Sequence, residues 1–435
     1  MIIKSFSARK VHGHHDFNFE FFKDVTFLVG INGTGKTSAL RLMQAALSID
    51  LYTLLSLKFS SLKIEVETEN SEYTLNILRK SDQLQFSLNG RELIFNISPL
   101  IDDETKTFNP QMEEHLEALR FQLIKSGNEI FGHFTSGVRP LFLGLERRMG
   151  RYDYEPHPFD TAIRPTNRGV IRNKRETLDG LENCQRLVER AYKQYRRISD
   201  GSIDRLLNII IESTFEYIDF DFDSLKPNDI NPREELEEFQ IRRQEIENFA
   251  KKLSGSEKVT AQVERFFLQL SEALNKYKDR NEEHFSLEWL MNLAQVQRIR
   301  KILAEIDRQK KTAEKFYAPI KEFEDSMNRF LKHSRKDLHI DPLGKIRISQ
   351  LGNPIDISLL SSGEKQLLIL MTHARFGFNK KSTFIVDEPE LSLHMRWQEM
   401  LIGALLDGNK NNQFIFATHS PEIVGYLTNH CIQVG

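Results

Sequence analysis

One octapeptide, Gly30-Ile31-Asn32-Gly33-Thr34-Gly35-Lys36-Thr37, lies between a predicted strand at residues 25–29 and a predicted helix at residues 36–48. Glycines at this spacing let backbone N–H groups curl around an anion, and the helix N-terminus adds positive potential. Lys36 is then placed to reach the outer phosphates of a nucleotide, and Thr37 to bind Mg²⁺. The octapeptide therefore predicts a phosphate-binding loop.

Strand and helix patterns at both ends of the chain indicate one α/β fold. Short strand-like segments occur at about residues 2–11 and 17–22, and residues 62–98 read as an antiparallel meander beside the first helix. The last hundred residues alternate strands and helices, which favours a largely parallel sheet. We therefore expect this sheet to be assembled from both ends of the chain.

The middle of the 435-residue chain is richer in long, charged, helical stretches. Its clearest helix carries apolar residues at three- and four-residue steps from Leu290 to Ile306 and is expected to end before Pro319. A compact helical hairpin or bundle is expected. The predicted divisions are an N-terminal half of the head at residues 1–149, a helical insertion at residues 150–335 and a C-terminal half of the head at residues 336–435.

The apolar strand at residues 383–387 ends in two carboxylates, Asp387 and Glu388. A pair of acidic residues after a strand is often only a solvated edge. Beside a phosphate-binding loop, Asp387 becomes the expected Mg²⁺ carboxylate, and Glu388 becomes the candidate for polarising an attacking water molecule.

Two further segments bear on the class of nucleotide hydrolase. Leu360-Ser361-Ser362-Gly363-Glu364-Lys365-Gln366 stands directly before a predicted helix, where Ser361 and Gly363 can offer donors to a phosphate or simply cap the helix. His419 follows another predicted strand, where it can contact a γ-phosphate or be structural.

In this order, the four segments resemble the ABC-type ATPase head, in the branch that includes DNA-repair, chromosome-maintenance and overcoming-lysogenization-defect-like ATPases. The resemblance covers roughly residues 1–148 and 336–435. It implies Walker A at Gly30 to Thr37, a signature at Leu360 to Gln366, Walker B at Phe384 to Glu388, a D-loop at Pro389 to His394 and a switch histidine at His419.

This resemblance implies an ATPase that uses ATP and Mg²⁺, with catalytic roles for Lys36, Glu388 and His419 and metal-binding roles for Thr37 and Asp387. The family's Q-loop has no clear counterpart, since the candidates are Glu146 to Arg148 and, less well matched, Gln111. The residues implied to contact nucleotide are Asn32, Gly33, Thr34, Gly35, Lys36, Thr37, Ser38, Ser361, Ser362, Gly363 and Glu364.

The resemblance also implies partners. Heads of this family dimerise with ATP between Walker A of one copy and the signature of the other, so a homodimer or larger homo-oligomer is expected. The layout looks like the stand-alone ATPase subunit of bacterial anti-phage systems of the Septu or phage-anti-restriction-induced type. This likeness implies a separately encoded nuclease or toxin as effector, and a phage-derived trigger is possible.

Charge leaves one alternative open. The chain has a net charge of -2, but its segment from Arg139 to Arg175 is locally basic. This segment either binds nucleic acid or an acidic partner or is a solvated loop, and direct binding would favour a DNA-repair or chromosome-maintenance head. The candidate residues are Arg147, Arg148, Arg164, Arg168, Arg172 and Arg175.

Composition limits the setting in which the chain works. No apolar run approaches the ~18 residues of a membrane span. The two cysteines, Cys184 and Cys431, suggest no disulfide framework. We therefore expect a cytoplasmic protein without a membrane partner.

Overall fold

The computed structural model describes residues 1–68, 71–81, 83–97, 116, 140–144, 180–215, 241–245, 287–377, 381–409 and 411–435, with isolated helical positions between 261 and 272. Its contacts divide the chain into two compact units. The first unit joins Met1–Tyr192 to Pro319–Gly435, and the second is Lys193–Ala318. The first unit thus includes residues at both ends of the proposed insertion, which spans residues 150–335.

The first unit contains a six-stranded antiparallel sheet in the order β2-β1-β4-β5-β6-β7. Alternate side chains of β4 are buried, which is the pattern of a sheet with one face on a core. This sheet confirms the predicted meander and adds β1 and β2 to it. The strands are β1 (Ile2–Val11), β2 (His15–Glu20), β4 (Ser61–Glu67), β5 (Glu72–Arg79), β6 (Gln83–Leu88) and β7 (Arg91–Asn96).

A five-stranded sheet lies beside it in the order β14-β3-β13-β12-β8, and every neighbouring pair is parallel. All residues of β12 and β13 are buried, as expected for parallel strands covered on both faces. Since β3 lies between strands from the C-terminal end, the predicted assembly from both ends is confirmed. The strands are β3 (Val25–Val29), β8 (Leu141–Leu143), β12 (Thr383–Asp387), β13 (Gln413–Thr418) and β14 (Cys431–Gln433).

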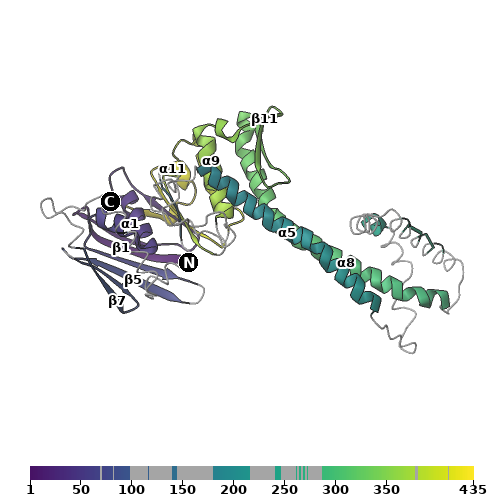
Figure 1. Cartoon of the computed structure of the whole chain (residues 1–435). Helices are drawn as coiled ribbons and strands as arrows, with labels where there is room; N and C mark the ends of the chain where they lie inside the picture. The colour runs from purple at the N-terminus through teal and green to yellow at the C-terminus, as the bar shows by residue number, and fades with distance from the viewer. Residues whose placement is uncertain are drawn as a thin grey trace, which may run out of the picture. The chain divides into compact units, whose positions relative to one another are not determined.

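A third, small sheet and several helices complete the first unit (Figure 1). The small sheet is antiparallel, with the order β11-β10-β9. The predicted α/β fold, with a parallel sheet and an antiparallel β subdomain, is confirmed. These elements are α1 (Lys36–Ser48), α2 (Leu51–Ser56), β9 (Lys336–Ile340), β10 (Ile346–Gln350), β11 (Asn353–Ile355), α9 (Ser362–Phe376), α10 (Met395–Leu406) and α11 (Pro421–Val424), with short 3-10 turns at Lys332–Ser334, Ile357–Leu359 and Thr428–His430.

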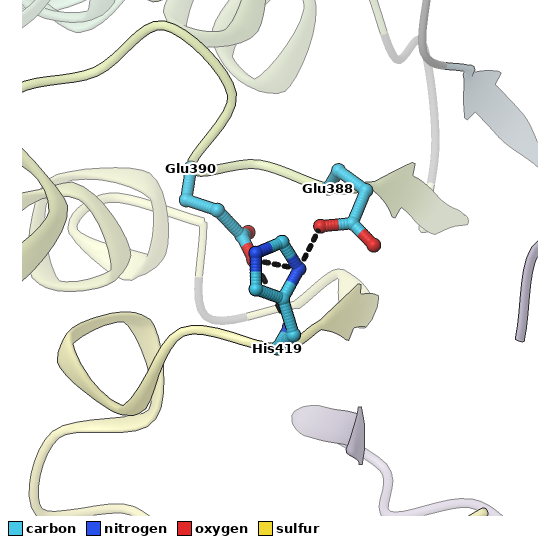
Figure 2. A group of neighbouring side chains, drawn as sticks. All are labelled: Glu388, Glu390 and His419. Carbon is cyan, nitrogen blue, oxygen red and sulfur yellow. Dashed lines mark hydrogen bonds and ion pairs between the residues drawn. The ribbon is translucent and has the colours of Figure 1, made fainter. Parts of the chain in front are cut away.

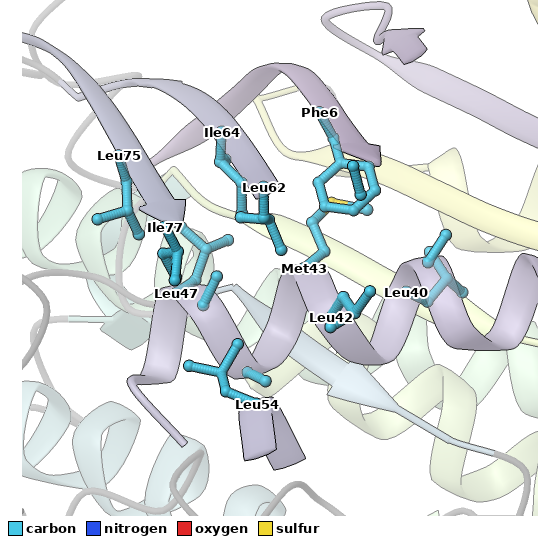
Figure 3. Close-up of a cluster of buried hydrophobic side chains, with 14 of the residues drawn as sticks. Phe6, Leu40, Leu42, Met43, Leu47, Leu54, Leu62, Ile64, Leu75 and Ile77 are labelled. Carbon is cyan, nitrogen blue, oxygen red and sulfur yellow. The ribbon is translucent and has the colours of Figure 1, made fainter. Parts of the chain in front are cut away.

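Two apolar cores pack helices against the sheets that surround the predicted phosphate-binding loop. Between α1 and the antiparallel sheet, Met43 and Leu47 of the helix face Phe6, Leu62 and Ile77 of the strands (Figure 3). On the other face of the parallel sheet, a second core packs strands β12 and β13 against α9 and α10. Burial of these apolar side chains holds α1 and α9 against the sheets.

Two long helices, α5 (Gly180–Phe215) and α8 (Leu287–Leu331), belong partly to each unit. In the second unit they lie side by side, where the rings of Tyr195 and Tyr317 are 5.1 Å apart (Figure 1). The prediction that the second helix ends before Pro319 is wrong. Helix α8 has 45 residues and includes Pro319 in its interior. Across the described residues, none of the helices is both long and apolar enough to span a membrane.

Candidate nucleotide-binding and hydrolysis site

The predicted phosphate-binding loop connects β3 to α1 by a tight backbone curve. Gly35 is the N-cap of α1 and has a φ of 89°, which side-chain-bearing residues rarely adopt. A Cβ at this position would also lie 2.7 Å from Cζ of Phe17. Glycine is therefore required here by both the backbone angle and the approach of β2.

Lys36 lies within this curve rather than in solvent. Its side chain is buried, and Nζ donates to the carbonyl oxygens of Gly30 at 2.7 Å and Ile31 at 3.1 Å. The ammonium group is thus held against the loop that would surround a phosphate. It supplies the positive charge that such a ligand needs.

The other predicted loop residues differ in their environment. Asn32 and Gly33 are exposed, while the Thr34 hydroxyl donates to the Ile31 carbonyl at 3.0 Å. Thr37 is half-buried in the first turn of α1. Ser38 is hydrogen-bonded to Nε2 of His12 at 2.8 Å, so the turn between β1 and β2 also contacts the start of α1.

The register of the parallel sheet brings the loop and the two carboxylates to one edge. Val29 of β3 pairs with Thr418 of β13, and Ala417 of β13 pairs with Asp387 of β12. The carboxyl ends of parallel strands share one edge of a sheet, where ligands of open α/β folds bind. Gly30, His419 and Glu388 therefore follow three adjacent strands at the same edge.

At that edge, His419 lies between two glutamates (Figure 2). Its Nδ1 is 2.6 Å from Oε2 of Glu388 and 3.3 Å from Oε1 of Glu390. The approach of this nitrogen to two carboxylate oxygens favours the tautomer with the proton on Nδ1, so we assign the proton there. Nε2 is then the ring nitrogen left for other contacts.

Burial raises the pKa of Glu388 to about 7, and the adjacent negative charge of Glu390 adds to this effect while His419 opposes it. Glu388 also has an unusual backbone, with a φ of 49°, and its N–H donates to the Ala417 carbonyl at 2.8 Å. A non-glycine residue held at positive φ stores local strain of the kind found at functional sites.

The donor atoms near this edge suit two kinds of metal ion differently. Asp387 is almost fully buried at the end of β12, and its oxygens together with a threonine hydroxyl are the hard ligands that Mg²⁺ prefers. Glu388, Glu390 and His419 also offer ligand atoms within 4.8 Å of one another. Because Nδ1 of His419 lies against both carboxylates, we interpret these three as an ion-paired cluster.

The signature segment forms the N-terminus of α9. Ser361 is the N-cap, its side chain accepts from the Glu364 N–H at 3.3 Å, and Glu364 Oε2 accepts from the Ser361 N–H at 2.7 Å. Glu364 is buried, and the same oxygen accepts from Nζ of Lys336 at 2.7 Å. The side chain of Glu364 is thus committed to the capping box, whereas Ser361 and Ser362 are exposed.

Gly363 brings this helix against the loop after β12. A Cβ on Gly363 would lie 2.5 Å from the carbonyl oxygen of Ser392. Ser392 itself has a φ of 61°. The start of the signature helix and the predicted D-loop are therefore in direct backbone contact.

Some predicted residues lie outside the described part of the chain. They are the Q-loop candidates Glu146 to Arg148 and Gln111, and the basic residues Arg147, Arg148, Arg164, Arg168, Arg172 and Arg175. One site residue was missed by the sequence reasoning, since Glu390 was placed in the D-loop without a role. The signal available was a second glutamate two positions after Glu388.

The chain is similar to several known proteins. Residues 207–425 match the family model described as "AAA domain, putative AbiEii toxin, Type IV TA system". The "Retron Vc95 probable ATPase" of Vibrio cholerae serotype O1 biovar El Tor is 23% identical over 429 residues, which cover 95% of this chain and 69% of that protein. The "Retron Ec83 probable ATPase" of Escherichia coli is 30% identical over 100 residues, or 22% of this chain and 18% of that protein.

Solved structures of low identity were also found. The Smc head domain of Pyrococcus furiosus, with an extended coiled coil and bound to the C-terminal domain of ScpA, has a TM-score of 0.41 and 14% identity over 97% of this chain and 91% of that chain. The SMC head domain from Thermotoga maritima has a TM-score of 0.37 and 13% identity over 98% of this chain and 91% of that chain.

Proposed function

The chain belongs to the AAA domain family described as "putative AbiEii toxin, Type IV TA system" and is an ABC-type ATPase, and from this premise we propose that it is an ATP-driven switch controlling a separately encoded effector. The effector is a nuclease or a toxin, and the setting is anti-phage defence in the cytoplasm. The similarity to two retron ATPases and the toxin named in the family description support this assignment.

One observation carries the enzymatic part of the proposal. The sheet register places the phosphate-binding loop, His419 and Glu388 after three adjacent parallel strands. In this arrangement ATP binds with its phosphates against the backbone N–H groups of residues 32–38. Lys36 neutralises charge on the outer phosphates, as expected for a loop of this type.

Mg²⁺ fits the same edge because Thr37 and Asp387 supply hard oxygen donors there. When bound, the ion would neutralise charge on the phosphates. Because Asp387 is buried at the end of β12, the strand fixes the direction of its carboxylate.

Glu388 is the proposed general base. It is only partly exposed and lies at the sheet edge, where it can accept a proton from the attacking water molecule. His419 holds this carboxylate through Nδ1, and its Nε2 is the group proposed to face the γ-phosphate.

The signature serines are proposed to act on a second copy of the chain. Ser361 and Ser362 are exposed at the N-terminus of α9, where donors and the helix dipole favour an anion. In a two-fold dimer each copy would complete the nucleotide site of the other, and the contact would be isologous. Glu364 contributes by fixing the capping box rather than by touching the nucleotide.

Glu388→Gln tests this mechanism. The variant removes the base but keeps the shape of the side chain, so we expect ATP binding to persist while turnover falls at least ~100-fold. ATP should then hold the variant in a dimer or larger assembly, as measured by light scattering. Lys36→Ala is the matched control, and it should lose both nucleotide binding and assembly.

Normal hydrolysis by Glu388→Gln would show that another group is the base. For effector control, the chain should be co-expressed with the products of its neighbouring genes and challenged with phage. We expect protection to require both the effector and an intact Glu388.

A further inference from the structure

Glu390 lies at the centre of the turn that follows β13. Its Oε1 accepts from the Thr418 hydroxyl at 2.6 Å, from the His419 N–H at 3.0 Å and from the Ser420 N–H at 3.2 Å. The same oxygen is 3.3 Å from Nδ1 of His419 (Figure 2). One oxygen atom therefore gathers donors from three consecutive residues.

This arrangement has the form of an anion-binding nest. Successive backbone N–H groups that converge on one point normally surround a phosphate or another anion. Here the anion is a carboxylate of the chain itself, and Glu390 is only 7% exposed. The turn that carries His419 is thus wrapped around a side chain supplied by the loop after β12.

The loop that supplies Glu390 is itself held tightly. The Leu391 N–H donates to the Glu388 carbonyl at 3.2 Å, and the Leu393 N–H donates to the Glu390 carbonyl at 2.9 Å. Glu388 and Glu390 are therefore two points on one short, hydrogen-bonded segment. Fixing Glu390 to the turn also fixes Glu388 relative to His419.

We propose that Glu390 is a positioning residue that locks the histidine turn to the loop of the general base, so that His419 and Glu388 keep the geometry needed for hydrolysis. The proposal rests on the function proposed above. In this proposal Glu390 does not touch the nucleotide, because its Oε1 is enclosed by the turn. Apart from the effect of its charge on the pKa of Glu388, Glu390 acts on the reaction through His419.

Steady-state ATPase kinetics of Glu390→Ala and Glu390→Gln test this role. Glu390→Ala removes the acceptor, so kcat should fall at least ~30-fold while KM for ATP changes less than ~3-fold. Glu390→Gln keeps a carbonyl oxygen that can accept the three donors, so it should lose less than ~5-fold in kcat. Glu422→Gln is the control, since Glu422 bonds only to the Ser420 hydroxyl of this turn and should behave as the unchanged protein.

A double-substitution cycle separates positioning from general support of the fold. In a His419→Ala background, Glu390→Ala should lower kcat by less than about a further 3-fold, because the group through which it acts is gone. If the double variant lowers kcat by the full product of the two single-variant effects, the proposal is overturned. A Glu390→Ala variant that loses ATP binding and thermal stability together with kcat, or one with unchanged kcat, would overturn it too.

These outcomes are independent of the assignment of the base. Normal turnover by Glu388→Gln would overturn the proposed mechanism, whatever the result for the Glu390 variants. Normal turnover by Glu390→Ala beside an inactive Glu388→Gln would remove only the positioning role.

Discussion

At the residue scale, His373 illustrates how burial fixes a protonation state. It lies in α9, where Nδ1 donates to the Ile369 carbonyl at 2.7 Å and Nε2 accepts from the Asn183 amide at 3.1 Å. Burial lowers the pKa of His373 to about 4, against the opposing effect of the Ile369 hydrogen bond. The ring is neutral at physiological pH and connects α9 to the start of α5.

This shift makes stability depend on pH. The folded state disfavours the protonated ring, so below pH 6.5 the unfolded chain binds more protons at this residue than the folded protein does. The free energy of unfolding should fall as pH drops from 6.5 to about 4, by up to ~1.4 kcal/mol per pH unit. Urea unfolding of His373→Leu across this range should show a shallower slope than the unchanged protein, and identical slopes would contradict the assignment.

The sequence could place some of the proposed site residues at one sheet edge because their signals are local. Gly30, Glu388 and His419 each follow an apolar strand directly, so their placement at one sheet edge needed only the parallel arrangement of those strands. Glu390 carried no such signal. Its partners Thr418 to Ser420 lie 28 to 30 residues away, and only the folded backbone turns their N–H groups toward it.

At the element scale, the signature helix and the loop after β12 form one contact. The approach of Gly363 to the Ser392 carbonyl leaves no room for a side chain. A displacement of either element must therefore move the other. The contact links Ser361, which would serve a second copy, to the segment that carries Glu388 in the same copy.

Gly363→Ala tests this contact. The added methyl group would lie 2.5 Å from the Ser392 oxygen, and relief of such overpacking costs ~1–3 kcal/mol. We expect thermal stability to fall and ATP-dependent dimerisation to weaken at least ~10-fold. The phosphate-binding loop of the monomeric variant should still bind ATP. Gly403→Ala in α10 is the control, because nothing lies within 4 Å of its Cβ position, and equal effects of both changes would contradict this account.

The length of α8 shows where helix signals fail. Pro319 lacks an N–H and so removes one helical hydrogen bond, which is why the sequence predicted an end before it. Beyond it, Ile320, Phe323 and Met327 are buried in the head. Packing of this apolar face outweighs the missing bond, and propensity alone could not reveal it.

At the scale of the whole molecule, one glutamine joins the two ends of the chain. The Gln413 amide donates to the carbonyls of Ile3 and Phe22, each at 2.8 Å. Its oxygen accepts from the Ile3 N–H at 2.8 Å and the Thr383 hydroxyl at 2.7 Å. The first strands are thereby tied to the start of β13.

Gln413→Ala should be strongly destabilising. It leaves several buried backbone groups without partners, at ~1–3 kcal/mol each, so we expect a loss of at least ~3 kcal/mol in the free energy of unfolding. Denaturant melts can compare it with Gln85→Ala, whose amide makes an exposed bond to Glu92 and which should cost less than ~0.5 kcal/mol. A similar small loss for both would show that the amide does not join the two ends.

The order of strands in the parallel sheet also has a consequence for synthesis. The neighbours of β3 are β13 and β14, which start at Gln413 and Cys431. While the chain is being made, the strand before the phosphate-binding loop therefore has no partner in this sheet until residues 413–418 have left the ribosome. The proposed ATP site can therefore form only after β13 has been synthesised, long after the phosphate-binding loop itself.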